Sequence, residues 1–127
     1  MTKRARPRRQ PTARDYPRTA RLNQLFHEIL AEELEKVDDD RLGLVTVMAV
    51  QCDGDLGQAI VYYDTLGGED DDEDVLEALA EHRHQLQGAI GRQTRVKRTP
   101  TLVFKPDHVA RDAARIEDLL RDMRDDD

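Results

Sequence analysis

Apolar residues recur every three or four positions in residues 18–37, at Leu22, Leu25, Phe26, Ile29, Leu30, Leu34 and Val37. This spacing places them on one stripe of an α-helix, while four glutamates occupy the opposite side. His27 lies beside the stripe, and no second metal ligand follows at helical spacing, so we expect a packed or surface histidine. The pattern predicts an amphipathic helix with one face on a core.

The period then changes in two neighbouring segments. Residues 44–50 are rich in β-branched side chains and are typical of a strand buried on both faces. The sequence "DGD" at residues 53–55 is a turn signal, and "QAIVYYDTL" at 58–66 predicts a second strand. Two strands with so short a link predict a β-hairpin.

The second half returns to helical spacing, with one interruption. Apolar positions from Val75 to Ile90 mark a helical segment in whose middle stands "HRH", residues 82–84. Residues 95–106 predict a strand in which Pro100 forces an edge position or a bulge. An amphipathic helix follows, with apolar positions at Val109, Ala113, Ile116, Leu119, Leu120 and Met123. The predicted order is α-β-β-α(α)-β-α, an α+β fold.

Length and composition restrict the class of protein. With 127 residues and 38% apolar residues, the chain suits one small domain. We divide it into a disordered basic arm (1–17), a folded domain (18–107), and a C-terminal helix with an acidic tail (108–127). No apolar run approaches the roughly 20 residues that span a bilayer, and the N-terminus lacks the apolar stretch of a signal peptide. The single cysteine, Cys52, excludes an internal disulfide, so we expect a soluble cytoplasmic protein.

The formal net charge of −7 hides a segregation of charge along the chain. Residues 1–21 carry eight Lys and Arg against one Asp, whereas residues 28–81 carry eighteen acids against two bases. Residues 82–127 are again slightly basic. Such blocks build a polarised surface, so that one face attracts phosphate while another repels it.

The residues needed for catalysis or metal binding do not come together in the sequence. No nucleophile–histidine arrangement can be placed, and His82 and His84 point about 200° apart on a helix, which prevents a shared metal. The acidic stretch 67–75 lacks the spacing of an EF-hand, and no phosphate-binding P-loop occurs. We therefore expect no catalytic residue, no metal and no cofactor.

A basic run follows the sequence "GAIG" at residues 88–91 and is the strongest candidate for a binding site. It comprises Arg92, Arg95, Lys97 and Arg98, with Lys105 farther along. On an extended strand Arg95 and Lys97 share one face, and such a row of cations can follow a phosphate backbone. "GAIG" itself is either the G-x-x-G loop with which KH domains approach RNA, or the end of a helix with Gly91 as its left-handed C-cap. A loop there leaves about eight residues before Pro100, too few for another full helix, so we expect "GAIG" to end a helix.

Three segments together resemble the ribosome-binding factor A family. They are "DDRLGLVTVMAV" (39–50), "GDLGQAIVYY" (54–63) and "RVKRTPTLVFKPD" (95–107), in the family's order and spacing. The resemblance implies a type II KH-like domain, α-β-β-α-kink-α-β, here with a C-terminal helix. It also implies a non-enzymatic factor that binds the free small (30S) ribosomal subunit and its 16S ribosomal RNA late in maturation.

The resemblance also implies where this chain would contact RNA. The family's interhelical kink falls on His82, Arg83 and His84, although this chain has neither the Ala nor the Gly of the family's pattern there. The expected RNA-binding residues are Arg83, Arg92, Arg95, Lys97, Arg98 and Lys105. We expect a monomer without a membrane partner; the alternatives are a KH-like module for other single-stranded RNA and a protein adaptor that uses the acidic loop.

Overall fold

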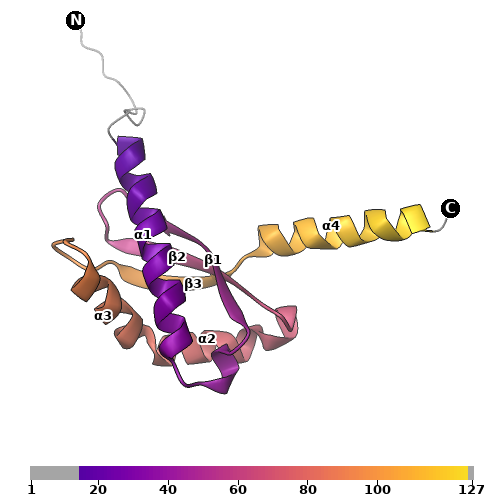
Figure 1. The fold of residues 1–127 in the computed structure, drawn as a ribbon, viewed down its shortest axis with the longest axis horizontal. Coiled ribbons are helices and arrows are strands. Elements are labelled where there is room, and N and C mark those ends of the chain that lie inside the picture. Colours follow the sequence, from indigo (N-terminus) through magenta and orange to yellow (C-terminus); the bar gives the residue numbers. More distant parts are fainter. Residues whose placement is uncertain (1–14, 126–127) are drawn as a thin grey trace, which may run out of the picture.

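The computed structural model describes residues 15–125 of the chain, and Figure 1 shows their arrangement. The element order is α1 (Asp15–Lys36), η1 (Asp40–Leu42), β1 (Val45–Cys52), β2 (Gln58–Thr65), η2 (Gly68–Asp71), α2 (Asp72–Glu81), α3 (Arg83–Gln93), β3 (Thr101–Pro106) and α4 (His108–Asp125). The α+β class and the order of helices and strands are as predicted. The expected disorder of the basic arm falls almost entirely outside the described residues, and α1 begins at Asp15, three residues before the boundary that we set.

The three strands form one sheet in the order β1-β2-β3. β1 and β2 are an antiparallel hairpin, and β3 joins β2 in parallel, so the α2–α3 segment is the crossover connection. The register shifts by one residue between Val47 and Ala49, which leaves Met48 as a bulge in β1.

One face of the sheet carries all three packing helices. A single buried cluster joins residues of α1, α2 and α3 to the inward side chains of the strands, among them Phe26, Val61, Leu79, Ile90 and Leu102. The first helix crosses this face, as Figure 1 shows. The predicted apolar stripes of residues 18–37 and 75–90 thus point toward the same core.

The other face of the sheet differs from the prediction. β1 was expected to be buried on both faces, but only Val47, Val50 and Cys52 of this strand are buried. Its neighbours Thr46, Ala49 and Gln51 are exposed. No helix side chain within residues 19–125 contributes to a core on that side. A run of β-branched residues cannot by itself tell how many faces of a sheet are covered.

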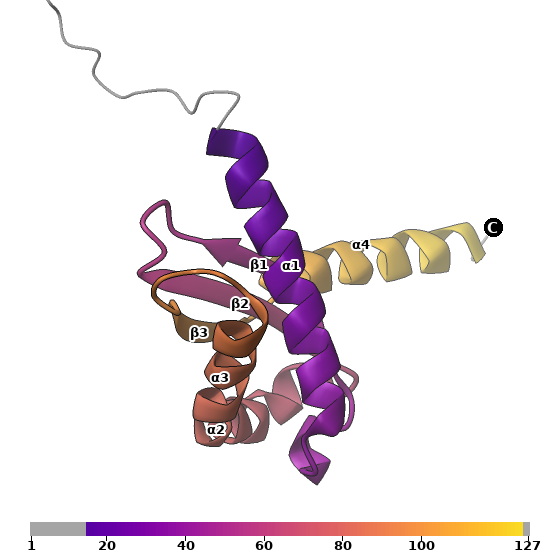
Figure 2. The same cartoon turned by 60° about the vertical axis from the view of Figure 1, so that its left-hand side comes forward.

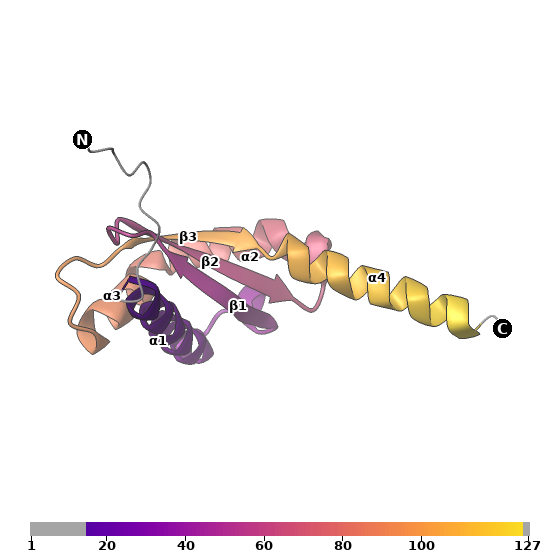
Figure 3. The same ribbon diagram turned by 90° about the horizontal axis from the view of Figure 1, so that it is seen from above.

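The C-terminal helix α4 projects from this domain, as seen from above in Figure 3. The backbone N–H of Asp107 donates to the Tyr63 carbonyl at 2.8 Å, and the Asp107 carboxylate caps the helix by accepting from the backbone N–H of Ala110 at 2.9 Å. Among the described residues, no helix is long and apolar enough to cross a membrane.

Candidate nucleic-acid interface

The helical segment 72–93 breaks at His82, within the three residues where the kink was expected. α2 ends at Glu81 and α3 begins at Arg83, while His82 between them has φ −98° and ψ 8°. Its N–H still donates to the Ala78 carbonyl at 3.0 Å, and its own carbonyl accepts from Leu86 at 3.1 Å. The two helices therefore meet at a bend without a loop between them, which Figure 2 shows from the side.

The side chain of His82 turns away from α3. Its Nε2 lies 3.0 Å from Asp39 Oδ2, and the same carboxylate accepts two bonds from the Arg41 guanidinium. Arg41 in turn reaches Glu81 at 2.7 Å. The Arg41 guanidinium and, after it, His82 hold the pKa of Asp39 well below its usual range. This cluster joins η1 to the end of α2, so His82 serves the fold and does not face a ligand.

Arg83 points the other way, toward the sheet. Its guanidinium carbon lies 5.9 Å from the centre of the Phe104 ring on β3, a cation–π distance. Its Nε is buried and has no hydrogen-bond partner within residues 15–125. His84, the third predicted kink residue, is exposed. The side chains of the three kink residues thus point in different directions, and only that of Arg83 lies against the β3 strand.

The sequence "GAIG" lies inside α3 and forms no loop. Ala89 and Ile90 are fully buried in the core. The helix continues to Gln93, and of the described glycines only Gly68 has a positive φ. The prediction that "GAIG" ends a helix and forms no G-x-x-G loop is therefore confirmed, but the C-cap assignment was wrong, because α3 ends two residues after Gly91 and its C-cap is Thr94.

A close approach explains the absence of a side chain at Gly91. A Cβ atom at this position would lie 3.1 Å from the Thr99 hydroxyl oxygen, which is tighter than most van der Waals contacts. The segment after α3 therefore folds back against the end of the helix. Thr94 fixes the start of this turn, because its hydroxyl donates to the Ile90 carbonyl at 2.8 Å.

The segment 94–100 after α3, here called the basic loop, carries three of the predicted cations. Arg95, Lys97 and Arg98 are all exposed, and none of them is in a strand. The predicted strand 95–106 begins only at Thr101, whose N–H donates to the Gly57 carbonyl at 3.0 Å. Pro100 lacks an N–H for a sheet ladder and is fully buried where the loop ends. The expected row of cations on one strand face is thus wrong, because the cations stand on a loop (Figure 2).

The cations of this region have no acidic partner among the side chains that the structure describes. Within residues 19–125 no ion pair includes any of the basic loop cations, Arg92 or Lys105, whereas Arg41, Arg111, Arg115 and Arg121 are all paired. Four positive charges close in sequence without compensation create a positive potential at this end of the domain. Phosphate is the anion that such a surface attracts in a nucleic acid.

The six predicted binding residues are not brought into one cluster. Arg83 and the basic loop lie at opposite ends of α3, whose 11 residues span about 16 Å. Lys105 pairs in register with Tyr62, so it points to the uncovered face of the sheet, opposite to Phe104 and Arg83. The structure therefore presents Arg92 and the basic loop as one group, and Arg83 and Lys105 as separate positions.

Two residues that shape this surface were not singled out from the sequence. Phe104 supports the Arg83 guanidinium, and Gln87 accepts a bond from the backbone N–H of Leu102 at 3.0 Å, which ties β3 to α3. The alternation of the β3 strand gives the inward direction of Phe104. Nothing in the sequence indicates the bond between Gln87 and Leu102. The described residues also contain no group of three or more His, Cys, Asp or Glu that could hold a metal ion.

Comparison with known proteins bears on this surface. The model of the family "Ribosome-binding factor A" matches residues 18–120. Two relatives with that name come from Kocuria rhizophila (40% identical, covering 89% of this chain and 74% of the relative) and Rubrobacter xylanophilus (39% identical, covering 87% and 90%).

Two solved structures are similar as well. The crystal structure of ribosome-binding factor A from Thermus thermophilus has a TM-score of 0.63 at 34% identity, covering 69% of this chain and 93% of that one. A homology model of the Thermus thermophilus protein, fitted into the cryo-EM map of its complex with the 30S subunit, has a TM-score of 0.58 at 36% identity, covering 68% and 92%.

Proposed function

The chain belongs to the ribosome-binding factor A family, and from that premise we propose that it binds the small ribosomal subunit. In finer detail, we propose that it contacts the 16S ribosomal RNA of free subunits and assists their late maturation. It would act as a monomer in the cytoplasm, without catalysis and without a cofactor. The related Thermus thermophilus protein in its 30S complex supports the choice of subunit.

The observation that carries this proposal is the uncompensated basic loop with Arg92. Exposed cations without acidic partners lose no ion pair when they meet phosphate, and each contact releases condensed counterions. The affinity that they supply is non-specific and salt-sensitive. Specificity would come from the fit of the KH-like face, with Arg83 at the kink, to a folded RNA site.

The acidic surface would orient the bound protein. The first turns of η2 and α2 consist almost wholly of acids: Glu69, Asp70, Asp71, Asp72, Glu73 and Asp74. Carboxylates are favourable at a helix N-terminus, which accounts for them locally. They also repel phosphate, so RNA is expected to approach the domain from the end that carries the basic loop.

A KH-like module for other single-stranded RNA is the second candidate. KH domains clamp single strands with a G-x-x-G loop, whereas here "GAIG" lies inside α3 with Ala89 and Ile90 buried. This arrangement favours a structured RNA site over a short strand. The two candidates differ in a direct measurement, since the module would bind short oligonucleotides as well as it binds subunits.

Sedimentation of cell extract tests the proposal. At low salt we expect the protein to travel with free or immature small subunits and only weakly with complete ribosomes. A protein that stays at the top of the gradient would contradict subunit binding. Equal affinity for short oligonucleotides and for purified subunits would favour the KH-like module instead.

A further inference from the structure

The basic loop contains one aliphatic residue, and it stands between two of the cations. Val96 is partly buried and packs against the buried cluster, whereas its neighbours Arg95 and Lys97 are exposed. Removing an apolar side chain from water favours the conformation that buries it. The middle of the loop is therefore attached to the core, and its cations point away from the attachment.

Both glycines of "GAIG" leave room for this cationic region. A Cβ atom at Gly91 would crowd the Thr99 hydroxyl near the end of the loop, and a Cβ atom at Gly88 would lie 3.2 Å from Nη1 of Arg92. Both distances are tighter than ordinary van der Waals contacts. One turn of α3 thus accepts the loop, and the turn before it accepts the guanidinium of Arg92.

The loop also ends on a fixed part of the β-hairpin. The backbone N–H of Thr101 donates to the Gly57 carbonyl at 3.0 Å. Leu56, the residue before it, is the one described non-glycine residue with a positive φ, 60°, and its side chain packs against the core. A left-handed backbone at leucine is unfavourable by itself and persists where the surrounding packing holds it. The hairpin position that receives the loop is therefore well defined.

A loop that is already held in its bound conformation loses less conformational entropy when it binds. We propose that the basic loop is a preformed phosphate-binding site and that Val96 is its positioning residue, which holds Arg95, Lys97 and Arg98 toward the RNA. This inference rests on the proposed function, because it assigns how the same surface binds ribosomal RNA. A purely structural role for Val96 predicts a loss of stability without a specific loss of binding.

Val96→Ser tests the proposal, because it removes the apolar attachment and keeps every charge. The matched control is Val37→Ser: Val37 is also partly buried against the same cluster. It directly follows α1, whose last turns lie at the start of α3, where Gln85 donates to Glu33 at 3.0 Å. This is the end of α3 away from the loop.

Co-pelleting with purified free small subunits measures the affinity. We expect Val96→Ser to bind about tenfold more weakly than the natural chain, and Val37→Ser to stay within about twofold of it. Val96→Ile, which keeps an apolar β-branched side chain, should restore the affinity. Because Val96→Ser keeps all its cations, the slope of log affinity against log salt should not change.

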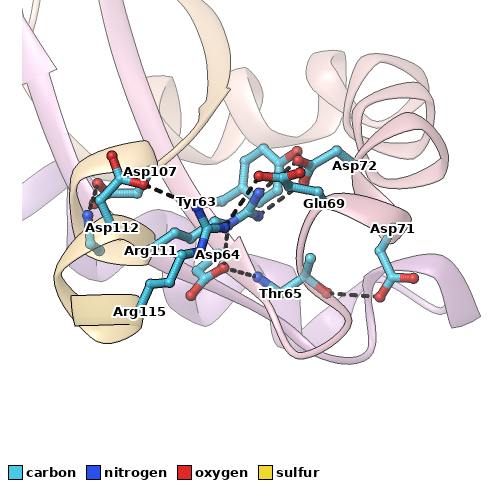
Figure 4. A network of polar contacts seen from close by, with 11 residues as sticks. Tyr63, Asp64, Thr65, Glu69, Asp71, Asp72, Asp107, Arg111, Asp112 and Arg115 are labelled. Carbon is cyan, nitrogen blue, oxygen red and sulfur yellow. Dashed lines mark hydrogen bonds and ion pairs between the residues drawn. The ribbon is translucent and has the colours of Figure 1, made fainter. Parts of the chain in front are cut away.

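Trypsin reports on the loop without RNA. It cleaves after Lys and Arg where the chain opens locally, so the three loop cations show whether the loop is held. In Val96→Ser, cleavage after these cations should be at least fivefold faster than in the natural chain, as identified by mass spectrometry. Cleavage after Arg121 is the internal reference. Its helix α4 is attached at the opposite end of β2, where the Arg111 guanidinium donates to Asp64 at 2.8 Å, as Figure 4 shows.

Other outcomes would overturn the proposal. If Val96→Ser binds subunits as tightly as the natural chain, or if Val37→Ser weakens binding equally, the position of the loop does not govern affinity. Unchanged cleavage of the loop in Val96→Ser shows that Val96 does not hold it. A natural chain that fails to bind purified subunits contradicts the proposed function and the phosphate site together. Faster cleavage in Val96→Ser then still assigns to Val96 the holding of the loop, which distinguishes the two failures.

Discussion

Arg111 is the one described residue of α4 that is buried, and it joins three elements. Besides its bonds to Asp64 and Asp72, its guanidinium carbon lies 5.9 Å from the centre of the Tyr63 ring. The Tyr63 hydroxyl donates to the same Asp72 at 2.8 Å. Removing the cation would leave a largely buried carboxylate without its charged partner, which is the costly way to break a pair. At the residue scale, this site determines how α4 leaves the domain.

We expect Arg111→Met to lower the free energy of unfolding by about 2 kcal/mol, less than for a fully buried pair because Asp72 is partly exposed. Urea denaturation, monitored by circular dichroism, measures this free energy. Arg121→Met removes an exposed pair with Asp118 and should change stability by no more than about 0.5 kcal/mol. Equal midpoints for the two variants would contradict a structural role for Arg111.

The same site predicts a pH dependence. The Arg111 guanidinium, followed by the Tyr63 hydroxyl, lowers the pKa of Asp72 in the folded state. A lowered folded-state pKa contributes stability that is present above the unfolded value of about 3.9 and is lost as the pH falls below it. Asp72→Asn should therefore be less stable than the natural chain at pH 7, and this difference should shrink between pH 5 and pH 2. A difference between Asp72→Asn and the natural chain that stays constant from pH 7 to pH 2 would refute the coupling.

At the scale of elements, α3 contributes to the core, whereas the basic loop that follows it carries the proposed binding residues. The inner side of α3 contributes Leu86, Ala89 and Ile90 to the core, and its last turn passes into a loop of exposed cations. Because these cations have no acidic partner within residues 19–125, their removal breaks no ion pair of that part of the fold. Substitutions in the basic loop should therefore change the affinity for small subunits without changing the free energy of unfolding.

Replacing Arg95, Lys97 and Arg98 with Ala should weaken binding to small subunits and leave the unfolding free energy within about 0.5 kcal/mol. The slope of log affinity against log salt should fall by about 2–3, since each lost phosphate contact removes about 0.7–0.9. The matched control replaces Arg115, Arg121 and Arg124 of α4 and removes the same charge. If both triple variants lose affinity equally, net charge alone governs binding, and the position of the cations on the basic loop does not matter.

At the scale of the whole molecule, opposite charges are separated along the chain. Six Lys and Arg residues lie within residues 1–14, whereas residues 28–81 carry eighteen acids against two bases. Among residues 19–125, the buried cluster and the residues packed on it lie between Leu22 and Phe104. We therefore expect the N-terminal cations to affect RNA binding more than stability.

Changing these six Lys and Arg residues to Gln should leave thermal unfolding nearly unchanged, because residues 1–14 have almost no apolar side chains to bury. Binding to subunits should weaken and its salt dependence should flatten. A variant with residues 2–14 in shuffled order should keep its affinity, because the electrostatic term does not depend on sequence. Loss of the folded signal in the Gln variant would show instead that the segment is structural.

Much of the fold was predictable because its signals are local. The three-to-four spacing from Leu22 to Val37 gave the first helix, and the turn residues Asp53 and Gly54 marked the hairpin. The resemblance to the family implied a kink at residues 82–84, and the helices break at His82, within that range. Local signals failed where tertiary contacts decide the outcome. Gly91 lies within α3, which continues to Gln93. A Cβ atom at Gly91 would lie 3.1 Å from the Thr99 hydroxyl oxygen.

The sequence by itself determined the order of elements, the family and the identity of the candidate cations, since periodicity, motif order and charge are properties of the chain; that these cations are unpaired was seen only in the structure. Only the tertiary structure decided which cations stand together. Pro100 delays β3 until Thr101, so Arg95 and Lys97 share a loop and no strand face. Sheet alternation sends Lys105 to the far side, and Arg111 turns the apolar stripe of α4 outward. These outcomes depend on contacts between residues up to 47 positions apart, which no local pattern encodes.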